Sequence, residues 1–140
     1  MAAAGRVLGI DYGSRRIGLA LTDPMGIIAS GAGTVENDST VVERLAVLVR
    51  SNEVRLIVIG MPYAPDGGKG QKAKEVDAFI ARLQGAVDIP VETWDESFTS
   101  VTAQETMRRG GMKKKQREEK GRVDEMAARL LLQEYLENHG

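Results

Sequence analysis

Apolar residues form three short runs in the first quarter of the chain, and each run has the length of a β-strand. The runs are Val7–Asp11, Ile17–Thr22 and about Ile27–Val35. The connections between them are short and contain Gly or Pro, which is typical of turns between antiparallel neighbours. The pattern therefore predicts a three-stranded antiparallel meander at the start of the fold.

Helical and strand patterns alternate through the rest of the chain. A helix is expected over about Thr40–Ser51, where Thr40 and Glu43 have the spacing of a capping box. The uninterrupted apolar run Leu56–Ile59 is typical of a strand buried on both faces. The remaining expected elements are a helix over about Gln71–Gln84, a strand over Val91–Asp95, a helix near Val101–Arg109 and a final helix over about Gly121–Glu137. This order predicts an α/β fold: a mixed five-stranded sheet, the meander plus two parallel strands, with helices on both faces.

Composition narrows the function classes. The chain has 140 residues, 42% of them apolar and 28% charged, which indicates one ordinary globular domain spanning residues 1–140. The formal net charge of −1 excludes a global field that would attract nucleic acid or membrane. Thiolate chemistry is excluded because there is no cysteine, and the only histidine is His139, so histidine triads are disfavoured. With no signal peptide or membrane-length apolar run, we expect a cytoplasmic protein that does not enter the membrane.

Acidic residues fall where three predicted elements meet. Asp11 ends the first strand, Asp95 and Glu96 end the last strand, and Asp124 lies on the predicted buried stripe of the final helix. Ligands of open α/β sheets collect beyond the carboxyl ends of strands, so these side chains are expected at one edge. A partly buried carboxylate is costly unless a cation or hydrogen-bond donors compensate it. Taken together, the acids predict a site for Mg²⁺ or Mn²⁺, which prefer oxygen ligands.

Two-metal phosphodiester hydrolysis is the chemistry that suits this set of acids. Three carboxylates and one phosphodiester balance the charge of two divalent ions. Each acid also has a simpler interpretation. Asp11 could bind a turn backbone, Asp124 could complement a helix dipole, and Glu96 could be solvated in a loop. Only their joint occurrence with this order of elements favours the metal site.

A strongly basic segment immediately precedes Asp124. Glu118 and Glu119 are its only acids, against eight basic residues: Arg108, Arg109, Lys113, Lys114, Lys115, Arg117, Lys120 and Arg122. Such a run is often only a solvated surface. Next to the predicted metal site, and with Arg15 and Arg16, it would instead form a rim that follows phosphates. The tyrosines and the single tryptophan are scattered, which favours recognition of backbone and shape over base stacking.

Four blocks of the sequence resemble the YqgF/RuvX family, the pre-16S rRNA nucleases related to Holliday junction resolvases. The blocks span most of the chain and keep their order: Leu8–Ala20, Ile57–Pro62, Asp95–Ser100 and Val123–Ala128. The resemblance implies an RNase H-like fold and assigns Asp11, Glu96 and Asp124 as catalytic acids and metal ligands. Ser97 stands where the family motif normally has Arg after Asp-Glu, so one phosphate or structural contact of the family is in doubt here.

The residues and the resemblance together predict a nuclease that uses Mg²⁺ or Mn²⁺ and cleaves structured RNA. The family implies the 5′ end of the 16S rRNA precursor as substrate, and a ribosomal precursor particle as partner. Asp11 would bridge the metals, and Arg15, Arg16, Lys113, Lys114, Lys115 and Arg117 would bind substrate. Two alternatives stay open: a resolvase of branched DNA, and a non-catalytic nucleic-acid-binding module for ribosome assembly or transcription. The oligomeric state is also open.

Overall fold

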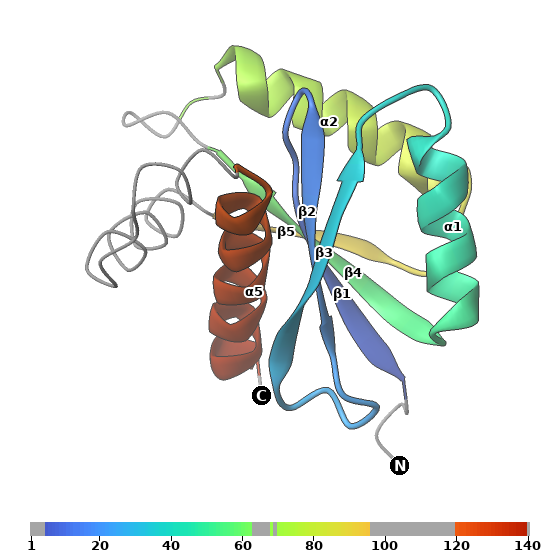
Figure 1. Ribbon diagram of the computed structural model, residues 1–140, viewed down its shortest axis with the longest axis vertical. Helices are drawn as coiled ribbons and strands as arrows, with labels where there is room; N and C mark the ends of the chain where they lie inside the picture. The colour runs from blue at the N-terminus through green and yellow to red at the C-terminus, as the bar shows by residue number, and fades with distance from the viewer. Residues whose placement is uncertain (1–4, 63–67, 69, 96–119, 140) are drawn as a thin grey trace.

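The computed structural model describes residues 5–62, 68, 70–95 and 120–139. The described elements form a five-stranded sheet between helices (Figure 1). In chain order they are β1 (Arg6–Asp11), β2 (Arg16–Thr22), β3 (Ala29–Glu36), α1 (Val41–Ser51), β4 (Val54–Met61), α2 (Gln71–Gln84), β5 (Val91–Asp95) and α5 (Lys120–His139). The helix expected near Val101–Arg109 lies outside the described residues.

The sheet has the strand order β3-β2-β1-β4-β5, with β1 at its centre. β1 pairs antiparallel with β2, and β2 with β3, which confirms the predicted meander. β1, β4 and β5 are parallel, so their carboxyl ends lie at the same edge of the sheet. The predicted mixed sheet is therefore confirmed, and Asp11 and Asp95 lie at one edge.

The two faces of the sheet carry separate apolar cores. Alternate residues of each strand point to opposite faces, so Leu8 and Ile10 pack under α1 and α2, whereas Val7 packs under α5. In Figure 1, α5 lies on one side of the sheet, and α1 and α2 lie on the other. β4 is buried along nearly its whole length because helices cover both faces. Within the described parts of the chain, no helix combines the length and apolarity needed to cross a membrane.

Helix α5 lies unusually close to the meander because each strand offers it a glycine. A Cβ on Gly9 of β1 would come within 2.8 Å of Leu132 Cβ, and one on Gly18 of β2 would collide with the backbone of Asp124. On β3, a Cβ on Gly31 would lie 2.8 Å from the Glu125 carboxyl carbon. A larger residue at Gly9 or Gly18 would push the helix off the sheet, whereas one at Gly31 would displace the Glu125 side chain. Gly9 and Gly18 therefore set the depth at which α5 packs on the sheet.

Two details differ from the sequence predictions. The third strand begins at Ala29 and not near Ile27, because one carboxylate oxygen of Asp23 accepts the backbone N–H groups of Ile27 and Ile28 at 2.9 and 2.8 Å. This bonding holds both isoleucines in the turn before the strand. The predicted capping box is also wrong.

At the start of α1, the Thr40 side chain makes no cap hydrogen bond to the helix. Its hydroxyl and its N–H both donate to Asp38 Oδ1, at 2.7 and 2.9 Å. Asp38 competes successfully for the hydroxyl because an ionised acceptor makes a stronger hydrogen bond than a neutral one. Its pKa is held below the ordinary value by these bonds to Thr40 and by Arg44.

Candidate active site

The two acids described at the predicted site, Asp11 and Asp124, come from opposite ends of the chain and meet on the α5 face of the sheet. Asp11 is the last residue of β1 and lies directly opposite Gly18 of β2 in the antiparallel register. The backbone of Asp124 lies on Gly18, as the space left by the missing Cβ shows. Asp11 is 7% exposed and its side chain points to the same face as Val7 and Gly9. The two carboxylates are therefore neighbours.

The charge of Asp11 acts on the Asp124 carboxyl. Burial raises the pKa of the Asp124 carboxyl above its ordinary value, and the negative charge of Asp11 raises it further. The positive charges of Arg16 and Lys72 act in the opposite direction, but they do not reverse the shift. Two like charges held together in a partly buried place favour either a shared proton or a bound cation.

Arg16 lies against this pair and does not extend freely into solvent. Its Nε is 3.5 Å from Asp124 Oδ2, which is an ion-pair distance longer than a tight hydrogen bond. Both side chains are 28% exposed. Arg15 is exposed on the turn between β1 and β2. Of the two arginines predicted to bind substrate, one is therefore engaged with a candidate catalytic acid and the other faces solvent.

The β1–β2 turn, which carries these arginines, is held by hydrogen bonds from a residue outside the β1–β2 hairpin. Asn37, just after β3, donates its N–H to the Arg15 carbonyl at 2.9 Å and its side-chain amide to the Gly13 carbonyl at 2.8 Å. A Cβ on Gly13 would collide with the Arg16 carbonyl oxygen, so the turn requires glycine there. The sequence analysis missed Asn37, because a residue that binds two carbonyls of a distant turn leaves no local pattern.

Glu96, Lys113, Lys114, Lys115 and Arg117 lie outside the described residues, so their predicted roles stay predictions. Asp95 is described, at the end of β5. Its neighbour Trp94 contacts α5 through a hydrogen bond of 3.1 Å from Nε1 to Glu134 and through ring contact with Tyr135. Successive strand residues point to opposite faces, so Asp95 points away from α5 and from Asp11. Strand alternation therefore disfavours Asp95 as the third acid.

Among the described residues, no three acidic or histidine side chains gather closely enough to hold a metal ion by themselves. Asp11 and Asp124 nevertheless fit a hard divalent cation: they are two interacting carboxylates, one of them almost fully buried. Mg²⁺ typically takes one or two protein carboxylates and completes its shell with water and phosphate. The donor set present is therefore compatible with Mg²⁺ or Mn²⁺.

Lys72 and Glu125 are two further residues near the site that the sequence analysis did not single out. Lys72 is an exposed residue in the first turn of α2, and its charge reaches Asp124. Glu125 Oε2 accepts the backbone N–H of Gly33 at 2.5 Å. Glycines within a strand are a sign of close approach by another group, so the glycines of β3 were the available signal for the Glu125 contact.

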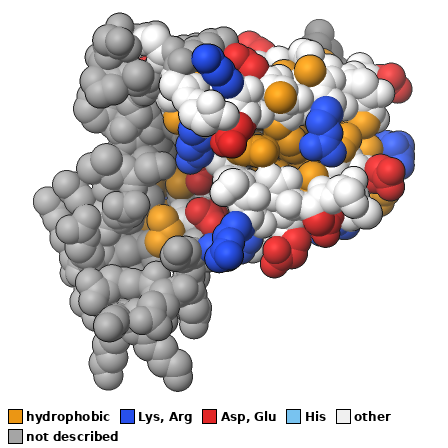
Figure 2. Space-filling view, turned by 90° about the horizontal axis from the view of Figure 1, so that it is seen from above, with side chains coloured by type: hydrophobic (Ala, Val, Ile, Leu, Met, Phe, Trp, Pro, Cys, Tyr) orange, Lys and Arg blue, Asp and Glu red, His pale blue; other side chains and the backbone are white. Residues whose placement is uncertain are grey.

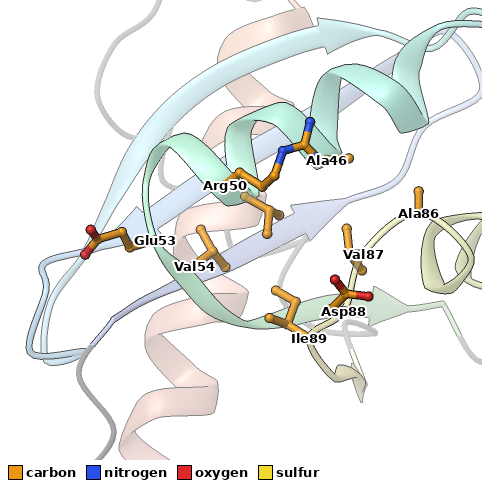
Figure 3. A pocket seen from close by; sticks show the side chains of 9 residues that line it. Ala46, Arg50, Glu53, Val54, Ala86, Val87, Asp88 and Ile89 are labelled. Atoms are coloured by element: carbon orange, nitrogen blue, oxygen red, sulfur yellow. The ribbon is translucent and has the colours of Figure 1, made fainter.

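Viewed from above, the end of the molecule that holds the β1–β2 turn has acidic and basic side chains interspersed (Figure 2). A cavity of about 220 Å³ lies elsewhere, between the end of α1 and the segment before β5. Figure 3 shows the side chains that line it, Val54 and Ile89 among them. Val54 begins β4, so this cavity lies at the opposite end of the strands from Asp11 and is not part of the candidate site.

Comparisons with known proteins identify the family of the chain and its fold. The family model described as "RuvX: Holliday junction resolvase" matches residues 5–138. A protein of Crocosphaera subtropica named "Putative pre-16S rRNA nuclease" is 44% identical over 132 residues, which cover 93% of this chain and 91% of that protein. A protein of Koribacter versatilis with the same name is 40% identical over 141 residues, covering 99% and 91%.

Solved structures with a similar fold include two resolvases bound to DNA. T. thermophilus RuvC in complex with a Holliday junction substrate has a TM-score of 0.60 at 16% identity, covering 97% of this chain and 96% of that chain. The Fowlpox virus resolvase in complex with Holliday junction DNA has a TM-score of 0.56 at 12% identity, covering 96% and 98%. At these identities the likeness concerns the fold, and it confirms the predicted RNase H-like architecture.

Proposed function

Because the chain belongs to the RuvX family, we propose that it is a divalent-metal-dependent nuclease that hydrolyses phosphodiester bonds of structured RNA. The names of its relatives support a precursor of 16S rRNA as substrate. Cleavage at the 5′ end and a ribosomal precursor particle as partner are further parts of the proposal, which rest on the family resemblance. We further propose that residues 1–140 act as one nuclease domain in the cytoplasm.

One observation carries the proposal: Asp11 and Asp124 interact at the carboxyl edge of a parallel strand set, on the face covered by α5. Two neighbouring carboxylates repel each other and destabilise the metal-free protein, and a bound cation would remove this repulsion. Asp11 and Asp124 would hold Mg²⁺ or Mn²⁺, with Glu96 as the third ligand that the family resemblance implies. Bound divalent ions would act as Lewis acids on the scissile phosphate and lower the pKa of the attacking water.

The chain's own residues would orient the substrate and the acids. Arg16 holds Asp124 by an ion pair at 3.5 Å and so limits the orientations of its carboxylate. Arg15 is exposed on the turn that follows Asp11 and would contact a phosphate of the substrate. Lys72 adds positive charge from α2. Lys113, Lys114, Lys115 and Arg117 would extend this basic rim along the phosphate backbone.

Resolution of branched DNA is the second candidate, favoured by the description of the matching family as Holliday junction resolvases. Both reactions hydrolyse a phosphodiester and need the same acids. Only the substrate that the basic rim accepts distinguishes them, so the experiment must compare substrates.

A cleavage panel tests the proposal. The full chain is incubated with rRNA precursor, single-stranded RNA and a four-way DNA junction, each with and without Mn²⁺. Asp11→Asn and Asp124→Asn are tested in parallel, and Asp88→Asn is the matched control because Asp88 is an exposed acid beside the distant cavity. We expect Mn²⁺-dependent cleavage of the rRNA precursor that both site variants lose and Asp88→Asn keeps. Preferred cleavage of the DNA junction would establish the resolvase instead. Binding without cleavage of any substrate would identify a non-catalytic module.

A further inference from the structure

We infer that Glu125 is a positioning residue: its bond to β3 fixes the first turns of α5, so that the Asp124 carboxylate is held beside Asp11. The inference rests on the proposed function, because it concerns the geometry of the proposed metal ligands. Glu125 is not placed among those ligands. It lies over the edge strand β3, whereas Asp124 lies over β2.

The contact of Glu125 with β3 is built by two glycines. Gly33 has φ +83°, a left-handed conformation that favours glycine, and its N–H donates to Glu125 Oε2 at 2.5 Å. Gly31 leaves the room that the carboxyl group occupies, since a Cβ there would lie 2.8 Å from Glu125 Cδ. Both glycines flank Ala32 in an edge strand that is otherwise paired regularly with β2 at its two ends.

The left-handed residue belongs to a β-bulge. Gly18 pairs with Thr34 and Ala20 pairs with Gly31, so one residue of β2 stands opposite two residues of β3. A bulge of this kind interrupts the ladder and turns a backbone group away from the neighbouring strand. Here the N–H of Gly33 is the group that becomes available, and Glu125 accepts it.

A second bond of the same type lies two helical turns further along. Gln133 Oε1 accepts the N–H of Ala29 at 2.9 Å. The acceptors are eight residues apart on α5, or about 12 Å at the rise of a helix. The donors are four residues apart on β3, or about 13 Å at the rise of a strand. The acceptors rise in number along α5 while the donors fall in number along β3, so the helix and the strand are antiparallel. Because the two spacings nearly match, α5 can be hydrogen-bonded to β3 at both points.

The hydrogen bonds of Glu125 and Gln133 to β3 limit the rotation of α5 about the helix axis. Near Asp124 the helix rests on the sheet through Ala128 and the space left by Gly18, whereas its large buried side chains, Leu131, Leu132 and Tyr135, lie further along. Small contacts at this end resist rotation of the first turns less than interlocking large side chains would. Glu125 lies beside the contact between Asp124 and Gly18, so its bond to β3 prevents the roll that would turn Asp124 away from Asp11.

The test compares Mn²⁺ affinity across matched variants of the full chain. Glu125→Ala removes the hydrogen bond between Glu125 and Gly33, called the clamp below. Gln133→Ala removes the equivalent hydrogen bond between Gln133 and Ala29, further from the site. Glu125→Asp keeps the charge but is one methylene too short to reach Gly33, and Glu125→Gln keeps an acceptor oxygen at the same length. Isothermal titration with Mn²⁺ alone gives the affinity. The Gly33 amide signal in ¹H–¹⁵N spectra without metal reports the clamp itself.

We expect Glu125→Ala and Glu125→Asp to weaken Mn²⁺ binding by roughly tenfold or more, the usual effect of losing a group that orients a ligand. Gln133→Ala and Glu125→Gln should stay within about threefold of the unmodified protein. Equal losses in Glu125→Ala and Gln133→Ala would overturn the inference, because the effect would then be general to the helix. A loss in Glu125→Gln as large as in Glu125→Ala would also overturn it, because Glu125 would then be a ligand.

The role of Glu125 can still be tested if the proposed function is wrong. If the unmodified protein binds no Mn²⁺ even with oligonucleotide, the metal site is refuted, and the Gly33 amide still decides whether the clamp exists. An unchanged Gly33 signal in Glu125→Ala would refute the clamp. If Glu125→Ala does not fold, Glu125→Asp and Glu125→Gln differ only in reach and charge and supply the same comparison.

Discussion

The backbone of Asp124 lies directly on Gly18, and Gly18 is the register partner of Asp11. A single glycine in β2 therefore sets how closely the final helix can bring one acid to the other. A Cβ at this position would collide with the Asp124 carbonyl, which is backbone and cannot rotate away. The distance between the two carboxylates depends on that missing methyl group.

Gly18→Ala should therefore impair both stability and activity. We expect a loss of about 1–3 kcal/mol in the free energy of unfolding, the usual cost of overpacking, and a large loss of cleavage because α5 must shift. Gly70→Ala is the control, since nothing lies within 4 Å of a Cβ there. Urea unfolding and single-turnover cleavage measure the two effects. A Gly18→Ala protein with normal activity would mean that the helix position is not critical.

Neutralising the acids should abolish cleavage without unfolding the protein. Asp11→Asn, Asp124→Asn and Glu96→Gln should each lower the rate at least about a hundredfold, because metal stabilisation is worth several kcal/mol. Near-normal cleavage by Glu96→Gln would exclude that residue as a ligand, and strand alternation disfavours Asp95 as its replacement.

The Asp124 variant should also change how stability depends on pH. Its folded pKa is raised, so the favourable contribution of the protonated group is complete below pH 3.8 and is lost as the pH rises through the folded pKa. Asp124→Asn lacks this loss, so its free energy of unfolding relative to the unmodified protein should rise across that window. Urea unfolding without metal between about pH 3 and 7 measures the difference. Asp88→Asn, an exposed acid away from the site, is the control variant.

Metal should stabilise the folded protein. Mn²⁺ bound only in the folded state adds RT ln(1 + [L]/Kd), about 2.7 kcal/mol at a hundredfold excess over Kd. Thermal unfolding with increasing Mn²⁺ should show a rising Tm, and Asp11→Asn should remove most of the increase while Asp88→Asn keeps it. If oligonucleotide is bound and Mn²⁺ still has no effect, the non-catalytic binding module becomes the better interpretation.

The free energy of unfolding should fall at alkaline pH when Tyr135 ionises, independently of the candidate site. Burial, together with the 2.9 Å hydrogen bond that its hydroxyl donates to Glu92, raises the pKa of Tyr135 to about 12. The stabilisation is complete below the ordinary value of 10 and is lost as pH rises through about 12. Tyr135→Phe should flatten this dependence in urea unfolding, and Tyr12→Phe should leave it intact. Absorbance titration of the tyrosines checks the shift directly.

The basic segment should bind phosphates whatever the base sequence. Replacing Lys113, Lys114 and Lys115 with Gln should weaken RNA binding and flatten the plot of log K against log[salt], by about 0.7 for each phosphate of a single strand that is no longer neutralised. The control replaces Arg50 and Arg82, which are exposed on α1 and α2. An unchanged slope would make the lysines a solvated surface, and Arg15 and Lys72 would be tested next.

The main elements of the fold were predictable because their apolar patterns reflect local geometry. Leu56–Ile59 indicated a doubly buried strand, and β4 is one. The beginning of β3 was not predictable from hydrophobicity, since Ile27 and Ile28 look like strand residues. They are 61% and 63% exposed because Asp23 holds their N–H groups in a turn. A polar side chain that binds nearby backbone can thus override an apolar pattern.

The proximity of Asp11 and Asp124 was predictable because it depends on the edge of a sheet. Asp11 ends a strand and Asp124 lies on the predicted buried stripe of the final helix, so sequence position was enough to place the two acids near each other. Glu125 was not predictable in the same way, because its role depends on a bulge in β3 that places Gly33 opposite it. Register shifts arise from pairing between distant segments, and no local spacing reveals them.

The separation of Asp11 and Asp124 along the chain has a consequence for biosynthesis. They are 113 positions apart (124 − 11), and a ribosome releases β1 long before it makes α5. A nascent chain can pair its first strands early, yet the two carboxylates cannot come together until α5 has left the ribosome and packed on the sheet. The proposed nuclease would therefore lack its pair of acids while the segments before α5 are being synthesised.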